Sequence, residues 1–519
     1  MKRIFLPIFF LMLGLAASAQ STIVMTSGGL AAGTASNGII SYKGIPYAKA
    51  ERFMAPHGPV TWEGVRTFNT YGTTSYQRSA GMGQDNVLEQ MGDDCQNLNI
   101  WTPQINDGKK RPVMVWIHGG GFETGSSWQS PTYDGENLSR NGDLVVVSVS
   151  HRLNAIGYLD LSDYGDKYKY SANAGILDLV EALKWIHNNI ERFGGDPENV
   201  TLFGESGGGG KIIVLLAAPS AHGLFHKAII ESGAFEGMGL TVNTQADSKH
   251  FASEVLKNLN LDAANIDDIQ RIPYDQLLEA ADKAMQAIPY RWTSVVDGDF
   301  LPKQPVESSS PEFSREIPLI IGTNFAEMST VSLIFSPEGK TDNKFTWTPE
   351  QKRTHLEKQL GDKLNTVLPA FKKAYPQREE IDAAYVDYSF RSRALKFLGV
   401  RAKEGGAPVF SYMYEYENPA NPHHMAFHTA EIAFVFNNLG KTDLDPKPEG
   451  KSQELADMMS RAWIQFARTG NPNHDGMPHW PAFTTSKRST MIFNADSEAR
   501  DAFDDELIQS LATDYQFIP

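Results

Sequence analysis

The sequence predicts an α/β fold, in which a large and mostly parallel sheet is covered by helices on both faces. Short apolar runs of strand length recur along the chain, and amphipathic helical patterns lie between them. Strands that are apolar throughout are typical of parallel sheets buried on both sides. The predicted strands are residues 112–118, 144–150, 199–205, 226–232, 317–324, 408–414 and 490–494. We therefore expect functional residues at the carboxyl ends of these strands.

The clearest predicted helix covers residues 173–195, "NAGILDLVEALKWIHNNIERFGG". Its apolar residues recur at spacings of three and four, which gives one buried stripe; they are Ile176, Leu179, Leu183, Ile186 and Ile190. Gly194 and Gly195 are suited to end the helix in a left-handed conformation. Asp196 and Pro197 then predict a turn into the next strand.

No Pro/Ser-rich linker, low-complexity tract or internal repeat marks a domain boundary in the sequence. Residues 20–519 are therefore expected to form a single α/β domain. Residues 237–312 and 330–405 are longer, more polar and richer in helix-forming residues than the other connections. We expect them to be insertions that roof the sheet and shape a gorge for the substrate.

The first residues predict a signal peptide over residues 1–19. Lys2 and Arg3 precede an apolar stretch that ends in Ala17-Ser18-Ala19, the pattern of a signal-peptidase site. We expect cleavage after Ala19 and export to the periplasm or the medium. A retained membrane anchor is the alternative, although the apolar stretch is shorter than the ~20 residues that span a bilayer. No later run is as apolar, so stable membrane insertion is not expected.

Charge and cysteine content limit the partners and cofactors. The formal net charge of −15 argues against nucleic acid or an anionic membrane surface as a partner. The single cysteine, Cys95, cannot form a disulfide within the chain. No compact group of histidine, cysteine and carboxylate residues has the spacing of metal ligands, so we expect neither a metal nor an organic cofactor.

The segment "GESGG" (204–208) predicts a nucleophilic serine at Ser206. It fits the pattern G-x-S-x-G and lies directly between a predicted strand and a helical stretch. At such a turn the serine adopts a strained backbone conformation that exposes its hydroxyl group, and Gly204 and Gly208 allow the close approach that the turn requires. A glycine-rich turn with an ordinary surface serine is the alternative.

The segment "HGGGF" (118–122) follows another predicted strand and predicts an oxyanion-binding loop. Glycines let backbone N–H groups approach a reacting carbonyl without a Cβ in the way. A phosphate-binding loop is disfavoured because the lysine and serine of a P-loop do not follow.

Serine enzymes with this strand-to-helix turn place the acid and then the histidine after the serine in the chain. Glu327 is the first carboxylate after the predicted strand 317–324. Asp297 and Asp299 compete with it, although their Asp-Gly-Asp context favours a turn. His423, His424 and His428 all follow the strand 408–414, and their positions alone do not choose among them.

Taken together, these motifs resemble the type-B carboxylesterase/cholinesterase family of α/β-hydrolases, including its bacterial carboxylesterases. The resemblance runs over nearly the whole mature chain and includes "YKGIPYA" (42–48), "DDCQNLNIWTP" (93–103), "VMVWIHGGGFETGSS" (113–127), "FGGDPENVTLFGESGGG" (193–209), "HTAEIAFVF" (428–436) and "FARTGNPN" (466–473). It implies Ser206 as the nucleophile, Glu327 as the acid and His428 as the general base, because the family's histidine precedes a Glu-Ile-x-x-Val-Phe stretch.

The resemblance also implies an oxyanion hole made by the backbone N–H groups of Gly120, Gly121 and Gly207. Glu205 matches a buried carboxylate of the family, and Ser232 a serine near the triad. Gly207 replaces the family's usual alanine, which leaves the N–H donor in place.

Two further departures concern the segment before the first motif. Cys95-Gln96-Asn97-Leu98 stands where the family usually has Cys-Leu-Tyr-Leu, and the chain has no second cysteine to pair with Cys95. Residues 76–94 contain no tryptophan, so the resemblance does not support selectivity for choline esters.

The expected function is hydrolysis of small carboxylic esters through an acyl-enzyme, without a cofactor. One alternative is a non-catalytic binding or adhesion protein with the same fold, although such relatives have lost the triad. Another is a hydrolase of amides or of polymer-linked esters, because triad chemistry alone does not select the substrate.

Overall fold

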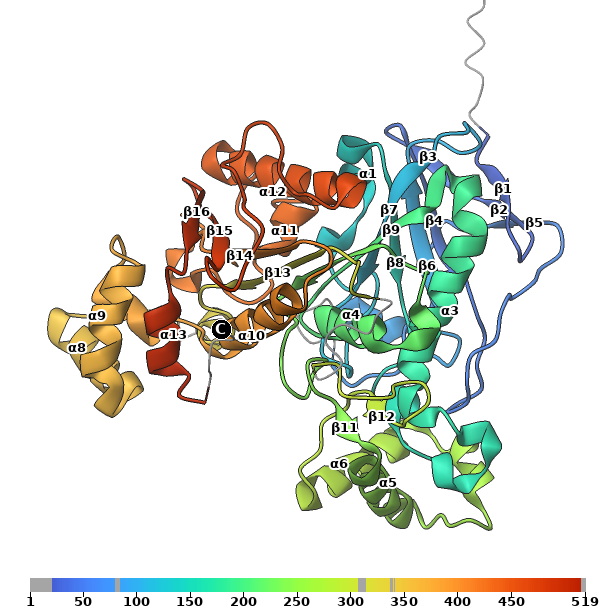
Figure 1. The fold of residues 1–519 in the computed structure, drawn as a ribbon. Coiled ribbons are helices and arrows are strands. Elements are labelled where there is room, and N and C mark those ends of the chain that lie inside the picture. The colour runs from blue at the N-terminus through green and yellow to red at the C-terminus, as the bar shows by residue number, and fades with distance from the viewer. Residues whose placement is uncertain (1–20, 80–84, 307–313, 337–338, 340, 515–519) are drawn as a thin grey trace, which may run out of the picture.

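The computed structural model describes residues 21–79, 85–306, 314–336, 339 and 341–514 (Figure 1). The predicted signal peptide, residues 1–19, lies outside the described residues, and its cleavage and the export of the chain stay predictions.

An 11-stranded sheet forms the centre of the molecule, in the order β16-β15-β14-β13-β10-β9-β7-β8-β6-β4-β3. All seven predicted strands belong to it and pair in parallel with one another. They are β7 (Arg111–Ile117), β8 (Val145–Val149), β9 (Gly195–Glu205), β10 (Lys227–Glu231), β13 (Leu319–Asn324), β14 (Val409–Tyr414) and β15 (Ser489–Phe493). The predicted fold class is therefore confirmed.

The antiparallel edges of the sheet were not predicted as strands. They are β3 (Thr34–Ser36), β4 (Ile39–Pro46) and β6 (Asn97–Thr102) on one side and β16 (Glu498–Asp501) on the other. Strand β6 is fully buried although it contains two asparagines. Asn99 donates hydrogen bonds to Ser127 and Ser148 at 3.0 Å each, so its side chain can be buried without an unsatisfied polar group. Because asparagine is polar, however, the segment lacks the apolar run that predicts a buried strand. A small separate sheet joins β1 (Ile23–Met25), β2 (Leu30–Ala32) and β5 (Val65–Thr67).

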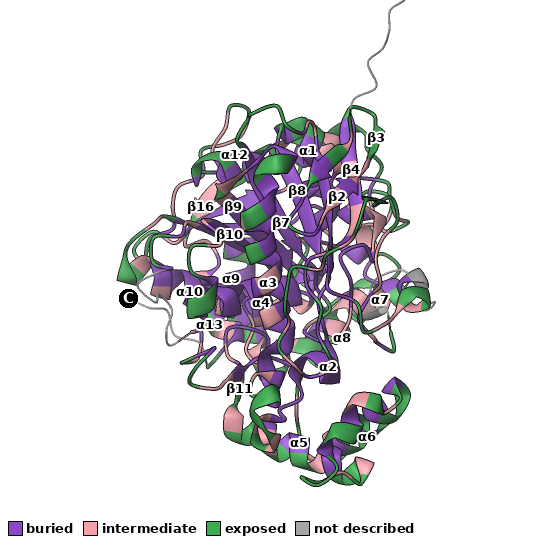
Figure 2. Ribbon diagram, turned by 90° about the vertical axis from the view of Figure 1, so that its right-hand side faces the viewer, coloured by how far each residue is buried: buried purple, intermediate pink, exposed green. Residues whose placement is uncertain are grey.

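Helices cover both faces of the sheet, each over its own apolar core (Figures 1 and 2). The helices α1 (Glu136–Gly142), α11 (Ile432–Val435) and α12 (Gly450–Thr469) lie on one face, and α3 (Ala174–Asn189), α4 (Gly207–Ala217) and α10 (Ser389–Glu404) on the other. Side chains of β7 alternate between the two cores: Val113 and Val115 pack into one, Met114 and Trp116 into the other. The short helix α2 (Asn154–Tyr158) packs against α3.

The predicted helix 173–195 is confirmed as α3 followed by a 3₁₀ turn, Ile190–Phe193. Its predicted apolar stripe is buried. Gly194 ends it with φ of 79°, the left-handed conformation expected there. Asp196 and Pro197, in contrast, do not precede β9 but lie inside it, where the pairing with β7 shifts register between Gly195 and Val200.

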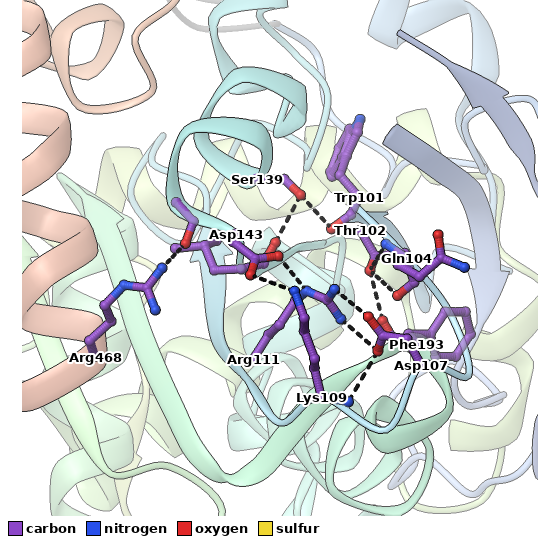
Figure 3. A network of polar contacts seen from close by, with 12 residues as sticks. Trp101, Thr102, Gln104, Asp107, Lys109, Arg111, Ser139, Asp143, Phe193 and Arg468 are labelled. Atoms are coloured by element: carbon purple, nitrogen blue, oxygen red, sulfur yellow. Dashed lines mark hydrogen bonds and ion pairs between the residues drawn. The ribbon is translucent and has the colours of Figure 1, made fainter. Parts of the chain in front are cut away.

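A polar network holds the amino-terminal end of β7 (Figure 3). The buried Arg111 donates through Nη2 to Asp107 at 2.5 Å and through Nε to Asp143 at 2.7 Å. Asp143 follows α1, whose last residue, Gly142, accepts a hydrogen bond from Arg468 of α12. The network therefore ties β7 to the helices on one face of the sheet, at the end opposite to the candidate site.

The two predicted insertions are largely helical. The first contains β11 (Asn243–Thr244), α5 (Gln245–Leu259), α6 (Tyr274–Ala287) and β12 (Val295–Val296). The second contains α7 (Val331–Phe335), α8 (Pro349–Leu360), α9 (Leu364–Ala374) and α10. In Figure 1, α5 and α6 form a lobe below the sheet, whereas α8 and α9 lie at its far edge, where α9 contacts α13 (Asp505–Leu511). Much of the second insertion thus packs against the sheet edge instead of roofing the site.

None of the helices in the part of the chain that the structure describes combines the length and the apolar character needed to cross a membrane.

Candidate active site

Ser206 lies at a sharp turn between β9 and α4. Its backbone has φ of 55° and ψ of −124°, a conformation that side-chain-bearing residues rarely adopt, as predicted for this turn. The turn is fixed because Ser206 N–H donates to the Glu231 carbonyl at 2.8 Å. A Cβ on Gly208 would lie 2.0 Å from the carbonyl oxygen of Ile117, so this glycine is required for the close approach of α4 to β7.

The glycine loop after β7 lies directly against the turn. A Cβ built on Gly119 would lie 3.3 Å from the Ser206 Cβ. Among the described residues, no acceptor receives a hydrogen bond from the N–H groups of Gly120, Gly121 and Gly207, so all three predicted oxyanion donors are available. Gly207 has a second role that the sequence did not reveal. A Cβ there would lie 2.1 Å from the Gly121 carbonyl oxygen, so the loop occupies the space that the family's usual alanine would fill.

Glu327 and His428 come together at the carboxyl ends of β13 and β14. The Nδ1 atom of His428 lies 2.6 Å from Glu327 Oε2. The other oxygen, Oε1, accepts hydrogen bonds from Ser232 Oγ and from the backbone N–H of Asn324, both at 2.7 Å. The carboxylate is therefore held in one orientation, and with it the imidazole ring.

The competing acids and histidines lie elsewhere. Asp299 pairs with Lys169, and Asp297 accepts hydrogen bonds from the backbone N–H groups of Asp299 and Leu301, as expected for a turn. His423 and His424 lie on a 3₁₀ turn, Pro422–His424, just before the segment of His428. None of these four residues lines the cavity described below, whereas His428 does.

Ser206 and His428 face the same cavity. In the described part of the chain no hydrogen bond joins the Ser206 hydroxyl group to His428, and the Nε2 atom of His428 lies 3.2 Å from Glu205 Oε1 instead. Catalytic hydrogen bonds are often long in unliganded enzymes and tighten when substrate binds. Since Nδ1 contacts Glu327, Nε2 is the ring nitrogen left for the Ser206 hydroxyl group, and in this structure it contacts Glu205.

Buried carboxyl groups surround His428. Burial, together with the neighbouring Glu431 and Glu327, raises the pKa of Glu205 well above its usual value, against the opposing effect of His428. Burial and Glu327 raise the pKa of Glu431 to about 7. For His428 itself, burial lowers the pKa, but the carboxyl groups of Glu205 and Glu327 outweigh it and raise the pKa above its usual value. These groups thus favour the protonated form of the His428 ring.

Lys211 is a buried residue near the site that sequence analysis missed. It lies on α4, its Nζ donates to the His118 carbonyl oxygen at 3.1 Å, and it lies over the Phe122 ring. Burial lowers the pKa of Lys211 to about 7. The signal was present in the sequence, because Lys211 interrupts the apolar stretch that follows the glycines. It holds the first residue of the glycine loop to the helix behind Ser206.

The cavity has a volume of about 760 Å³. Its walls come from the glycine loop and the segment after it, the turn at Ser206, the two insertions and the residues just before them, the segment of His428, and a loop over residues 441–445. They include Gly120, Tyr133, Ser206, Phe235, Met238, Arg291, Phe390, His428, Lys441, Asp443 and Asp445. From the described parts of the predicted insertions, only Met238, Arg291 and Phe390 reach it, whereas the loop 441–445 was not predicted as a wall. Within the described residues, no group of three or more His, Cys, Asp or Glu side chains is placed to hold a metal ion.

Comparison with known proteins identifies the family. The model of the carboxylesterase family matches residues 20–510, nearly the whole chain. The chain belongs to the carboxylesterase family. This esterase is 35% identical over 487 residues to the para-nitrobenzyl esterase of Bacillus subtilis (strain 168), a match that covers 91% of this chain and 95% of that protein. It is 31% identical over 491 residues to the phenmedipham hydrolase of Pseudarthrobacter oxydans, over 91% of this chain and 94% of that protein.

Solved structures agree with this assignment. An esterase from the anaerobe Clostridium hathewayi that can hydrolyse aliphatic aromatic polyesters superposes on this esterase with a TM-score of 0.86, at 36% identity, over 95% of this chain and 98% of that one. The similar proteins are esterases and hydrolases, so this chain is a carboxylic ester hydrolase, and the expected α/β-hydrolase fold and family are confirmed.

Proposed function

We propose that this esterase hydrolyses small carboxylic esters through a Ser206–His428–Glu327 triad and an acyl-enzyme intermediate. The observation that carries the proposal is the shared cavity of Ser206 and His428, with His428 Nδ1 held 2.6 Å from Glu327. The strained backbone of Ser206 supports it, as do the N–H groups of Gly120, Gly121 and Gly207, which have no acceptor within the described part of the chain.

In the first half of the reaction, His428 Nε2 accepts the proton of the Ser206 hydroxyl group while Oγ attacks the ester carbonyl carbon. Glu327 keeps Nδ1 protonated and stabilises the imidazolium. The tetrahedral oxyanion accepts hydrogen bonds from the three free N–H groups. His428 then donates its proton to the departing alcohol, which leaves the acyl group on Ser206.

In the second half, water takes the place of the alcohol. His428 removes a proton from the water as it attacks the acyl carbon, and the second tetrahedral oxyanion is held by the same N–H groups. Its collapse breaks the bond to Ser206, which regains its proton from His428. The products are one alcohol and one carboxylic acid, and the enzyme returns to its starting state.

The test is hydrolysis of a series of chromogenic esters with graded acyl length by the mature protein and by Ser206→Ala. We expect turnover that depends on acyl length in the wild type and a loss of about 10⁴-fold or more in the variant, because the nucleophile is removed. Thermal unfolding of both proteins checks that the variant is folded. A Ser206→Ala variant that matches the wild type would overturn the proposal.

Polymer-linked esters are a second candidate substrate class, because the Clostridium hathewayi esterase can hydrolyse aliphatic aromatic polyesters and is 36% identical to this chain. Adding a soluble polyester oligomer and the matching amide to the series decides between the candidates. Release of acid from the oligomer at a rate near that of the small esters would favour the polymer, whereas amide hydrolysis is expected to be much slower.

We also propose that the chain is exported and that the signal peptide is removed after Ala19. Lys2, Arg3 and the Ala17-Ser18-Ala19 site support this. Amino-terminal sequencing of the protein from its native host is expected to begin at Gln20, and a retained residue 1 would contradict the proposal.

A further inference from the structure

Arg291 is a cation in the wall of the active-site cavity that has no ion pair among the described residues. Its backbone is fixed, because the Arg291 carbonyl accepts a hydrogen bond from Asn243 at 2.9 Å. The neighbours on both sides pack away from the cavity: Tyr290 stacks on Phe251 of α5 with ring centroids 3.9 Å apart, and Trp292 meets the same ring edge-on. Arg291, between them, is the one of the three that lines the cavity.

An apolar path leads from His428 toward Arg291. The Phe390 ring lies 5.3 Å from the His428 ring, and the Phe235 ring lies 4.8 Å from Phe390, centroid to centroid. Next along the chain, a Cβ on Gly237 would lie 3.8 Å from Arg291 Cδ, and Met238 completes this part of the wall. A group bound beside His428 therefore meets apolar surface first and a guanidinium group beyond it.

Arg291 and Lys441 are the lysine and arginine side chains among the described residues of the wall. Lys441 lies on the same short loop as Asp443 and Asp445, which also line the cavity, whereas the wall near Arg291 is apolar. Arg291 lowers the pKa of Glu123, although burial and Asp282 raise that pKa overall. A guanidinium group offers paired N–H donors that match the two oxygens of a carboxylate.

We propose that Arg291 binds a carboxylate carried by the substrate itself, so that this esterase prefers esters with a free carboxylate on the acyl part, as in half-esters of dicarboxylic acids, or on the alcohol part, with an apolar spacer between that carboxylate and the scissile ester. The inference rests on the proposed function and names the substrate class of the same site. No additional chemical step is involved: Arg291 touches the distal carboxylate, while Ser206 attacks the ester carbonyl as in any other substrate.

The test compares matched substrates that differ only in the terminal charge. One pair carries the charge on the acyl part, 4-nitrophenyl hydrogen adipate against 4-nitrophenyl methyl adipate. The other carries it on the alcohol part, the acetate ester of 4-hydroxybenzoate against that of methyl 4-hydroxybenzoate. Both pairs are measured with the wild type, Arg291→Met, Arg291→Lys and the control Lys441→Met, each checked by thermal unfolding.

For at least one pair, Arg291→Met is expected to lower kcat/KM for the anionic ester by about fivefold, mainly through KM, because the charge pair of an exposed arginine is lost. Its kcat/KM for the neutral ester stays within about twofold of wild type. Arg291→Lys is expected to keep part of the preference for the anionic ester that Arg291→Met loses. Lys441→Met is expected to leave the ratio of kcat/KM for the anionic ester to kcat/KM for the neutral ester unchanged in both pairs.

The proposal is overturned if Arg291→Met lowers kcat/KM equally for the anionic and the neutral ester of each pair, or for neither of them. It is also overturned if Lys441→Met changes the preference for the anionic ester more than Arg291→Met does. Hydrolysis of the neutral esters shows whether a negative result concerns the carboxylate site alone or the proposed function as well. If the folded wild type hydrolyses no neutral ester, the proposed function fails; if it hydrolyses neutral esters normally and Arg291→Met leaves the anionic ones unchanged, only the carboxylate site fails.

Discussion

At the scale of single residues, Glu205 lies where it can set the basicity of His428. Its Oε1 atom lies 3.2 Å from Nε2, the nitrogen that accepts the serine proton in the proposed mechanism. Because the carboxyl groups of Glu205 and Glu327 raise the pKa of His428, the neutral imidazole that acts as a base becomes available only above the ordinary histidine range. The acidic limb of the pH profile therefore reports this arrangement.

Replacing Glu205 by glutamine is expected to move the acidic limb of kcat/KM to lower pH. Protonated His428 lowers the pKa of Glu205, so the two groups can pair as ions at 3.2 Å. Glutamine removes that carboxylate, so the pKa of His428 falls and the neutral base is present at lower pH. The measurement is kcat/KM for a neutral ester between pH 5 and pH 9. Glu231→Gln is the matched control, because Glu231 is also buried but is hydrogen-bonded to Trp463 at 2.6 Å. An unmoved limb in Glu205→Gln, or one moved to higher pH, would contradict the assignment.

Lys211 makes a prediction about stability. In the unfolded chain its amino group keeps its proton up to about pH 10, whereas in the fold burial lowers its pKa to about 7. Between these values the unfolded chain binds more protons, so the stability of the wild type rises with pH across this interval and is lowest below pH 7.

Lys211→Met should therefore remove a pH dependence of about 2–3 kcal/mol in the free energy of unfolding between pH 5 and pH 9. The variant loses the hydrogen bond to the His118 carbonyl at every pH. Because the wild type is least stable at low pH, the free energy of unfolding of the variant relative to that of the wild type is expected to be highest at pH 5. Chemical denaturation at both pH values measures this. A difference between variant and wild type that is the same at pH 5 and pH 9 would show that Lys211 does not titrate in this way.

At the scale of elements, the turn between β9 and α4 and the glycine loop after β7 depend on each other. The loop approaches so closely that a Cβ on Gly207 would meet the Gly121 carbonyl oxygen at 2.1 Å. The identity of residue 207 therefore determines where the loop lies, and with it the position of two of the three proposed oxyanion donors.

Gly207→Ala is expected to lower kcat by about 10²–10³-fold while KM changes little, because displacement of the loop removes donors that act only in the transition state. Steady-state kinetics with a neutral ester measures the effect. Gly92→Ala serves as the control, because its added Cβ would also meet a neighbour, Thr73 Cγ2 at 2.9 Å, but neither residue lines the cavity. Wild-type kcat in Gly207→Ala would show that the loop tolerates a Cβ and that its present position is not needed.

Asn438 joins the two elements that bring distant walls of the cavity together. Its Nδ2 donates to the carbonyl oxygens of Thr132 and Asp134, both at 2.8 Å, and its Oδ1 accepts from Asn137 at 2.9 Å. It thereby ties the segment after the glycine loop to the chain that leads into residues 441–445.

Asn438→Ala should raise KM several-fold and destabilise the fold by about 2 kcal/mol, since buried carbonyl groups lose their donors. Kinetics with a neutral ester and thermal unfolding check both effects. Gln453→Ala is the control, because its side chain donates to Asn437 and Asp457, which are more exposed than Asn438. Unchanged KM in Asn438→Ala would mean that the loop 441–445 is held by other contacts.

Elements that are apolar throughout could be predicted from the sequence, and those that bury polar groups could not. The seven parallel strands and α3 follow from runs and stripes of apolar residues. Strand β6 was not predicted because it buries Asn99 with its hydrogen bonds satisfied. The placement of α9 at the sheet edge depends on its contacts with α13, and α8 packs on α9; no local pattern encodes these contacts.

At the scale of the whole molecule, the candidate site is assembled from segments far apart in the chain. Ser206 follows β9, Glu327 follows β13 and His428 follows β14. Because these strands are parallel, their carboxyl ends lie on the same side of the sheet. The motifs and the family resemblance pointed to these residues in the sequence. What they could not give is the environment between them: the placement of Glu205 against His428 Nε2, the buried Lys211, and Arg291 in the wall depend on how distant segments pack.

The central claim is that Ser206 becomes acylated during ester hydrolysis, and trapping that intermediate tests it most directly. The mature enzyme is mixed with an excess of a 4-nitrophenyl ester, quenched in acid during the first turnovers, digested, and analysed by mass spectrometry. The account predicts the mass of the acyl group on the peptide that contains Ser206, and no acyl group on that peptide in Ser206→Ala. Acylation of a different residue, or turnover that persists in folded Ser206→Ala, would contradict it.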